Sequence, residues 1–215
     1  MATRVRRTPD EARRQILEAA AKLLSTGGPG AVQVRAVAAE VGVSDAAVNH
    51  HFGTREQLLS ALLRFGGAKL KSELRAALDA WDDDQAADPG GLVRALLALY
   101  ADGFAELALA LRQLGWRTGS GLLDEAVHRL HSQAVTACAA TGRTPPSRGA
   151  IRLTLAALHQ AVATEPLFGD EFRRSVGLDA SARDHLVEWW IETLRMTMAG
   201  SDPSTGSRPA GHGGQ

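Results

Sequence analysis

Apolar side chains recur with helical spacing in a short segment near the N-terminus. Four of them share one helical face because they occupy positions i, i+3, i+4 and i+7. They are Val34, Val37, Ala38 and Val41. The next residue, Gly42, can take the left-handed conformation that often ends a helix, because it has no Cβ atom. The pattern predicts a short amphipathic helix that ends at this glycine.

A second short helix is predicted directly after this turn, from about Asp45 to His50. Ser44 can cap its N-terminus by accepting a hydrogen bond from a free backbone N–H group. The residues expected to be buried are Ala47, Val48 and Phe52. The opposite side carries the small or polar residues Asp45, Ala46, Asn49 and His50. Two helices joined in this way form a helix-turn-helix, whose second helix enters the DNA major groove.

Capping signals predict one further helix on each side of this motif. Thr54 and Gln57 have the spacing of a capping box and begin a long helix over about 55–81. Upstream, Thr8 followed by a proline begins a first helix that extends to about Ser25. A Gly-Gly-Pro-Gly stretch then ends this first helix. The N-terminal part is therefore expected to be a three-helix domain.

Helical periodicity continues through the rest of the chain, and the alternation typical of β-strands is absent. Further helices are expected over about 91–115, 121–140, 147–164 and 180–199. Pro166 is expected to end the third of these, followed by a looser stretch through Phe168 and Phe172. The predicted fold is all-α, with a DNA-binding domain over 1–54, a larger helical domain over 55–199 and a disordered Gly/Ser/Pro-rich tail over 200–215.

The N-terminal motifs, taken together, resemble those of the tetracycline-repressor (TetR) family of transcription regulators. The resemblance covers about residues 9–60, a quarter of the chain. After the Gly-rich break, its motifs are Val-Arg-Ala-Val-Ala at 34–38, Val-Gly-Val-Ser at 41–44 and His-His-Phe-Gly-Thr-Arg-Glu at 50–56. Asn49 stands where the family usually has a tyrosine, and Arg55 where it usually has a lysine.

The resemblance implies which residues contact DNA. Those at family positions that contact the DNA backbone are Gln33, Ser44, Asn49, His50, His51 and Arg55. Those at positions that often read bases are Arg35, Asp45 and Ala46. Asn49 keeps a hydrogen-bonding side chain that could also sort base edges. Arg55 keeps the positive charge needed to reach a phosphate.

The charge distribution adds a possible phosphate-binding arm. Lysine and arginine together number 24, as do aspartate and glutamate, so the formal net charge is zero. Residues 1–14 nevertheless carry a net charge of plus three and include Arg4, Arg6 and Arg7. This asymmetry would turn the N-terminal end toward phosphate, although a basic tail can also serve solubility alone.

Cysteine content and hydropathy indicate the compartment. Cys138 is the only cysteine, so no intrachain disulfide can form, in agreement with a reducing cytoplasm. The basic N-terminus is not followed by the apolar segment of a secretory signal. The apolar stretch over 92–111 contains three charges, at Arg94, Asp102 and Glu106. A membrane span seldom tolerates three charges, so we expect a cytoplasmic protein without a membrane partner.

No catalytic, metal or cofactor site is expected. His50 and His51 are adjacent in sequence, so they point to different sides of a helix and do not suit shared chelation. His128 and His131 could share a metal across one helical turn, but only Asp124 is near as a third ligand. The chain also has no Gly-rich phosphate loop, paired-carboxylate signature or nucleophile elbow.

The last two predicted helices carry broad apolar stripes that suggest a second burial surface. In the TetR family, two such helices pair with their copies as a four-helix dimer interface. The resemblance maps them to about 147–164 and 180–199. The interface candidates are Ile151, Leu155, Leu158, Val162, Leu186, Trp189, Trp190 and Leu194. The two tryptophans could equally be ordinary core residues.

The sequence thus predicts a homodimeric regulator, most simply a repressor, that binds a palindromic DNA operator. A small molecule in the C-terminal domain would release the protein from DNA. Pocket candidates are Tyr100, Phe104, Trp116 and His159. Two alternatives remain at this point, namely a helical enzyme and a protein-interaction module that happens to carry a helix-turn-helix-like domain.

Overall fold

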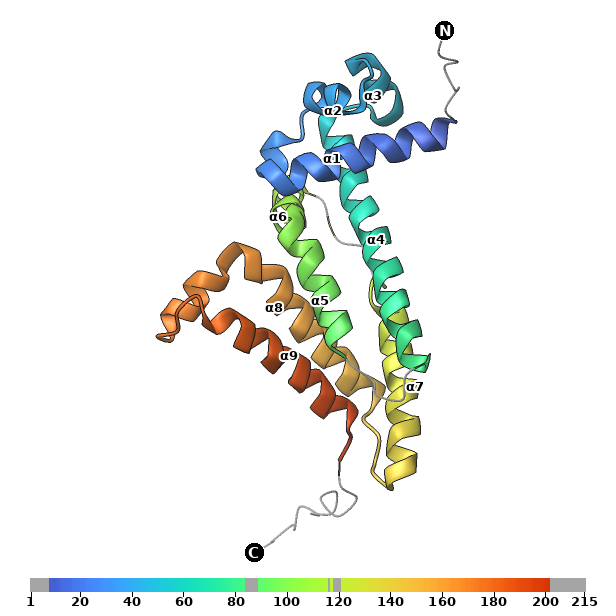
Figure 1. The fold of residues 1–215 in the computed structure, drawn as a ribbon, viewed down its shortest axis with the longest axis vertical. Helices are drawn as coiled ribbons and strands as arrows, with labels where there is room; N and C mark the ends of the chain where they lie inside the picture. The colour runs from blue at the N-terminus through green and yellow to red at the C-terminus, as the bar shows by residue number, and fades with distance from the viewer. Residues whose placement is uncertain (1–7, 84–88, 116, 118–120, 202–215) are drawn as a thin grey trace, which may run out of the picture.

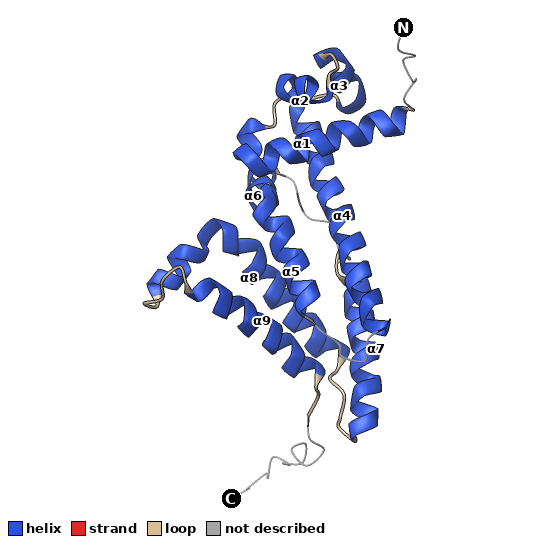
Figure 2. Ribbon diagram, in the orientation of Figure 1, coloured by secondary structure: helices blue, strands red, loops and turns tan. Residues whose placement is uncertain are grey.

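The computed structural model describes residues 8–83, 89–115, 117 and 121–201. All the extended regular structure in these ranges is helical, which confirms the predicted all-α fold (Figure 2). The helices are α1 (Pro9–Ala31), α2 (Val34–Val41), α3 (Asp45–Phe52), α4 (Arg55–Asp83), α5 (Gly90–Leu99), the π-helical segment η1 (Tyr100–Phe104), α6 (Ala105–Gln113), α7 (Asp124–Thr141), α8 (Arg148–Ser175) and α9 (Ala182–Met198). The predicted arm residues Arg4, Arg6 and Arg7, the pocket candidate Trp116 and tail residues 202–215 lie outside the described ranges.

The helices form an elongated molecule with α1, α2 and α3 gathered at one end (Figure 1). The long helix α4 begins among them and runs along the molecule, with α7 packed against it. The helices α8 and α9 pair with each other and pack on α5. The helix α1 crosses above η1 and packs on it. The N-terminal helices therefore touch the remainder of the chain through α4, through η1 and through α6.

The buried side chains form one continuous cluster that extends from α1 to α9. At the start of α4, Leu58 and Leu62 are fully buried, so this helix contributes to the core beneath α3 as well as to the long body. Burying a leucine contributes about 1.5–3 kcal/mol relative to leaving it exposed. The shared core makes α4 a rigid connection between the two ends of the molecule.

The predicted continuous helix over 91–115 is wrong, because the chain breaks in its middle. Asp102 has ψ 18° and Gly103 has φ 88°, so neither residue is helical. At this point the backbone of Gly103 passes so close to α1 that a Cβ atom would lie 2.9 Å from the carbonyl oxygen of Leu24. The break therefore lets η1 meet α1. No helix in the described ranges is both long and apolar enough to cross a membrane.

The predicted helix end at Pro166 is also wrong, because α8 continues through this proline to Ser175. Proline removes one intrahelical hydrogen bond and commonly kinks a helix without ending it when the tertiary structure holds the next turn. Here the buried ion pair between Glu165 and Arg173 joins the two sides of the proline, with Oε1 and Nη1 2.5 Å apart. Figure 1 shows α8 bending in its C-terminal part. Phe168 and Phe172 therefore lie on a helix instead of the expected loose stretch.

Candidate nucleic-acid interface and ligand cavity

The turn between α2 and α3 has the local chemistry that the sequence predicts. Gly42 is left-handed, with φ 75° and ψ 38°, and its N–H group donates to the carbonyl of Ala38 at 2.9 Å. The Ser44 hydroxyl accepts a hydrogen bond of 3.2 Å from the backbone N–H of Ala47 and so caps α3. Val48 and Phe52 are buried. They hold one side of α3 against the domain core, which leaves the opposite side outward.

The outward side of α3 is open to solvent. The exposed residues of the predicted DNA-contacting set are Gln33, Arg35, Ser44, Asp45, Ala46, Asn49 and His50. Figure 1 places α2 and α3 at the end of the molecule, beyond α1. The small side chain of Ala46 lets the helix backbone approach a partner surface closely. The structure thus brings most of the predicted set together on one accessible end.

His51 differs from this set because it is only half-exposed. Its ring lies 5.6 Å from the ring of His50 and 6.4 Å from that of Phe52, measured between centroids. Its backbone carbonyl accepts a hydrogen bond from Arg13. His51 therefore stands at the border between the exposed side of α3 and the domain core.

Arg13 on α1 fixes the C-terminal end of α3, a role that the sequence does not predict. Its Nη1 atom donates to the carbonyl of His51 at 2.6 Å, and its guanidinium lies 4.3 Å from the centroid of the Phe52 ring. A cation at the C-terminus of a helix also interacts favourably with the helix dipole. The two partners lie 38 residues apart in the chain, so no local sequence pattern could have identified this contact.

The Arg55 side chain carries the predicted positive charge, and it points into the protein. Its Nε donates to the carbonyl of Val32 at 2.8 Å, and its Nη2 donates to that of Pro29 at 2.6 Å. These bonds fasten the start of α4 to the connection between α1 and α2. The side-chain amide of Gln33 donates to Gly30 in the same connection, at 2.9 Å. Both residues therefore shape the domain, and their predicted contacts with phosphate remain predictions.

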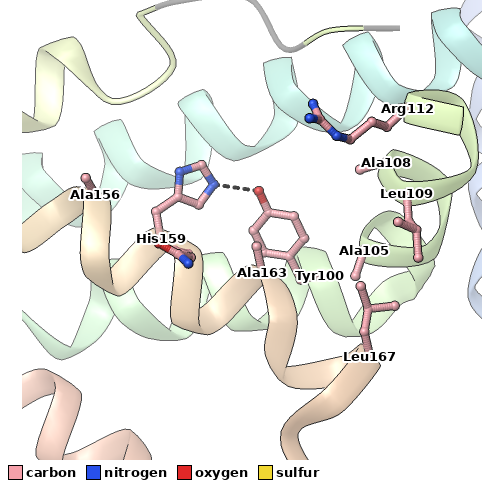
Figure 3. A pocket seen from close by; sticks show the side chains of 10 residues that line it. Tyr100, Ala105, Ala108, Leu109, Arg112, Ala156, His159, Ala163 and Leu167 are labelled. Carbon is pink, nitrogen blue, oxygen red and sulfur yellow. Dashed lines mark hydrogen bonds between the residues drawn. The ribbon is translucent and has the colours of Figure 1, made fainter. Parts of the chain in front are cut away.

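A cavity of about 440 Å³ lies between α8 and the segment formed by η1 and α6 (Figure 3). This volume is within the range of about 300–1,000 Å³ that is usual for small-molecule sites. The lining residues are Tyr100, Ala105, Ala108, Leu109, Arg112, Ala156, His159, Gln160, Ala163 and Leu167. Two predicted pocket residues, Tyr100 and His159, thus meet there although 59 positions separate them in the chain.

Tyr100 and His159 form a hydrogen-bonded pair at one side of this cavity. The Tyr100 hydroxyl oxygen and the His159 Nε2 atom lie 2.5 Å apart, as Figure 3 shows. Burial raises the pKa of Tyr100 and lowers the pKa of His159, because removal from water disfavours the charged form of each group. The pair is therefore held neutral near neutral pH.

The lowered pKa of His159 predicts a loss of stability in mild acid. Below the ordinary histidine value of about 6.5, the unfolded chain binds a proton that the folded chain does not yet bind. The free energy of unfolding should therefore fall as the pH drops from this value toward the lower pKa of the folded protein. We expect His159→Gln to reduce this fall, measured by urea denaturation at several pH values. Parallel pH profiles for the wild type and the variant would contradict the prediction.

The other two pocket candidates are not part of this lining. Phe104 is buried, and its ring packs against Gly66 of α4 so closely that a Cβ atom there would lie 2.1 Å from the ring. The Phe104 ring therefore fills the contact between η1 and α4, and its role in a ligand pocket stays a prediction. Trp116 lies outside the described residues.

The predicted dimer-interface residues are mostly the inward side of α8 and α9. The members buried within the single chain are Ile151, Leu155, Leu158, Val162, Trp190 and Leu194. These six side chains pack inside the single chain, and their assignment to a dimer interface stays a prediction. Leu186 is half-buried, and only Trp189 of the predicted set is exposed, at 62%. The apolar stripes are therefore burial surfaces within the chain, as the helical period indicates.

The histidine pair that could suggest a metal has another neighbour in the structure. His128 Nδ1 lies 3.0 Å from Nη2 of Arg148. Among the residues that the structure describes, no group of three or more His, Cys, Asp or Glu side chains is placed to hold a metal ion.

Comparison with known sequences extends over much of the chain. Residues 16–62 match the sequence profile of a family described as bacterial regulatory proteins, tetR family. An HTH-type transcriptional repressor of Mycobacterium tuberculosis is 35% identical over 176 residues, which cover 81% of this chain and 89% of that protein. The HTH-type transcriptional regulator BetI of Rhizobium meliloti is 36% identical over 100 residues, covering 46% of this chain and 47% of that protein.

Solved structures show the same fold at lower sequence identity. A TetR-family member of Streptomyces coelicolor aligns with a TM-score of 0.51 and 21% identity, over 87% of this chain and 98% of that one. The fatty acid degradation regulator FadR of Bacillus halodurans aligns with a TM-score of 0.52 and 19% identity, over 88% and 96% of the two chains. At this identity the likeness concerns the arrangement of helices and not the molecules that each protein binds.

Proposed function

Because the chain belongs to the TetR family of helix-turn-helix transcriptional regulators, we propose that it is a homodimeric repressor of a palindromic operator. A small molecule in the cavity beside Tyr100 and His159 would release it from DNA. Repression is suggested by the M. tuberculosis relative, which is described as a repressor. This proposal would exclude the two alternatives that the sequence left open, namely a helical enzyme and a protein-interaction module.

The single observation that carries DNA recognition is the exposed side of α3. Ala46 and Asn49 lie there next to the capped N-terminus of the helix, and Arg35 is exposed on the adjacent α2. This arrangement suits a helix that enters the major groove with its N-terminal residues toward the base edges. Arg35 and Asn49 have the donors and acceptors for direct reading of bases.

Exposed apolar side chains on α8 and α9 support a dimer. Trp189 and Met196 are seven positions apart on α9 and so share a face, and they are 62% and 66% exposed. Leu153 on α8 is 75% exposed. Its neighbour Thr154 joins α8 to α9, because the hydroxyl groups of Thr154 and Thr197 lie 3.1 Å apart. A two-fold pair through this surface would bury exposed apolar side chains of both copies.

The contact between η1 and α1 supports coupling of the cavity to DNA binding. Tyr100 is the first residue of η1, and Gly103 of the same segment touches the backbone of Leu24 in α1. A ligand that prefers one position of Tyr100 would therefore bias the position of α1. DNA release then requires that the ligand bind more tightly to the arrangement of helices that cannot bind DNA than to the arrangement that can.

The test begins with selection of genomic DNA fragments by the purified full-length protein, followed by affinity measurements on the recovered sequence. A palindrome whose half-sites lie about 34–36 Å apart is expected for a two-fold dimer. Arg35→Ala and Asn49→Ala should each weaken binding by roughly 10–100-fold, because each lost base contact is worth about 1–3 kcal/mol.

Arg75→Ala is the control, because this exposed arginine of α4 pairs with Glu125 of α7, far along the helix from α3. Its affinity should match that of the wild type. Binding should also weaken steeply with added salt, as phosphate neutralisation requires. The proposed DNA interface would be rejected if Arg35→Ala and Asn49→Ala both left the DNA affinity unchanged, or if the DNA affinity did not depend on the salt concentration.

A further inference from the structure

We propose that the cavity beside Tyr100 and His159 binds an organic monocarboxylate with an apolar body, and the inference rests on the function proposed above. Three features of the lining lead to this class of ligand. They are the formal charge of the lining groups, the hydrogen-bond donors that they present and the shape of the apolar walls.

The charge of the lining favours an anion over a cation. Among the lining residues that the structure describes, the only one with a permanent charge is Arg112, and none is a carboxylate. The nearby acids Asp102 and Glu106 do not line the cavity. A cationic ligand would therefore lose its hydration without gaining a counter-charge, whereas a carboxylate can pair with the guanidinium.

The Tyr100–His159 pair supplies a second donor. One hydrogen lies between the two atoms, so one donor of the pair is left over. This donor is the His159 Nδ1–H group if Tyr100 donates, and the Tyr100 O–H group if His159 donates. In Figure 3, Arg112 extends toward the side of the cavity where Tyr100 meets His159. The cavity therefore offers more hydrogen-bond donors than a neutral hydrocarbon could use. These donors suit a ligand whose polar end only accepts hydrogen bonds.

The remaining walls, apart from the polar side chain of Gln160, are apolar. They consist of Ala105, Ala108, Leu109, Ala156, Ala163 and Leu167. Alanine side chains end at Cβ, so the space between α6 and α8 is left for the ligand and not filled by the protein. An alkyl chain or a single aromatic ring can bury its surface there, while the carboxylate remains at Arg112, which is exposed.

The test uses three probes with the same body, namely 4-phenylbutanoate, 4-phenylbutanamide and 4-phenylbutylamine. Their affinities for the full-length protein are measured by calorimetry at neutral pH. The carboxylate should bind at least about tenfold more tightly than the amide or the amine, because a charge-assisted pair contributes more than a neutral hydrogen bond. Arg112→Gln should remove this preference and leave amide binding unchanged, whereas Arg75→Gln should leave all three affinities unchanged.

Three outcomes would overturn the inference: the amide or the amine binding as tightly as the carboxylate, no binding of any probe, or a preference for the carboxylate that survives in Arg112→Gln. DNA binding of the same preparations is measured in parallel. If DNA binding is intact while the carboxylate preference is absent, only the ligand class is wrong. If sequence-specific DNA binding is absent, the proposed function fails whatever the probes do.

Discussion

Replacing Gly103 by alanine is expected to lower the free energy of unfolding by roughly 2–4 kcal/mol. Gly103 has φ 88°, a left-handed conformation that disfavours a side chain. The new Cβ atom would also lie 2.9 Å from the carbonyl oxygen and 3.0 Å from Cγ of Leu24. Leu24 is only 1% exposed, so it cannot move aside without disturbing the core. Urea denaturation followed by circular dichroism measures the loss.

Gly115→Ala separates the two causes of this loss. Gly115 has φ 89°, almost the same as Gly103, but a Cβ atom there would meet nothing within 4 Å. This control should cost only about 1 kcal/mol, the conformational part of the effect. Equal losses in the two variants would mean that the approach of η1 to α1 is not tight. The route from the cavity to the DNA-binding helices would then lose its structural basis.

Glu165→Gln is expected to lower the free energy of unfolding by roughly 3 kcal/mol, because it leaves a buried arginine without its main counter-charge. The Glu165 and Arg173 side chains are 6% and 5% exposed, and the hydrogen bond to Glu165 is the largest cause of the raised pKa of Arg173. Arg183 also loses a partner, since it lies 3.4 Å from the same carboxylate. The pair closes the bend of α8 at Pro166, so denaturation experiments should show a less stable α8–α9 region.

Glu171→Gln on the same helix is the matched control. Glu171 pairs with Arg174 at 3.5 Å, and the two side chains are 62% and 66% exposed. Solvent screens such a pair, so its loss should change the stability by less than about 0.5 kcal/mol. If the two glutamine variants behave alike, the ion pair of Glu165 and Arg173 does not hold the bend of α8. Replacing both Glu165 and Arg173 by leucine should recover much of the stability lost in Glu165→Gln.

The helix-turn-helix could be predicted closely because its signals are local. Gly42, Ser44 and the Thr54–Gln57 capping box each act on backbone groups within four residues, and all of them behave as predicted. The hydrophobic period also identified which faces of α8 and α9 are buried. The period alone does not say whether the buried face meets the same chain or a second copy. For this reason the assignment of these residues to a dimer interface stays a prediction.

Each difference from the prediction depends on a contact beyond the four-residue range of a helical pattern. The break at Gly103 is decided by the backbone of Leu24, and the passage of α8 through Pro166 by the pairing of Glu165 with Arg173. Phe104 is an aromatic residue of the kind that can line a ligand pocket, but its ring packs on Gly66. Two of these contacts join different helices, and the third spans the bend within α8. The sequence gives the order of the helices but does not fix the angles between them.

The amino-acid sequence by itself determined the N-terminal caps of α1, α3 and α4, the turn between α2 and α3, and the family to which the chain belongs, although α1 continues to Ala31, past the end predicted near Ser25. These properties come from interactions between neighbours in the chain, which the order of residues specifies directly. Only the tertiary structure decided that Arg13 holds the end of α3, that Arg55 turns inward, and that Tyr100 meets His159 in a cavity. Each of these contacts joins residues at least 23 positions apart. Such contacts form only once the packing of the helices has fixed their relative positions.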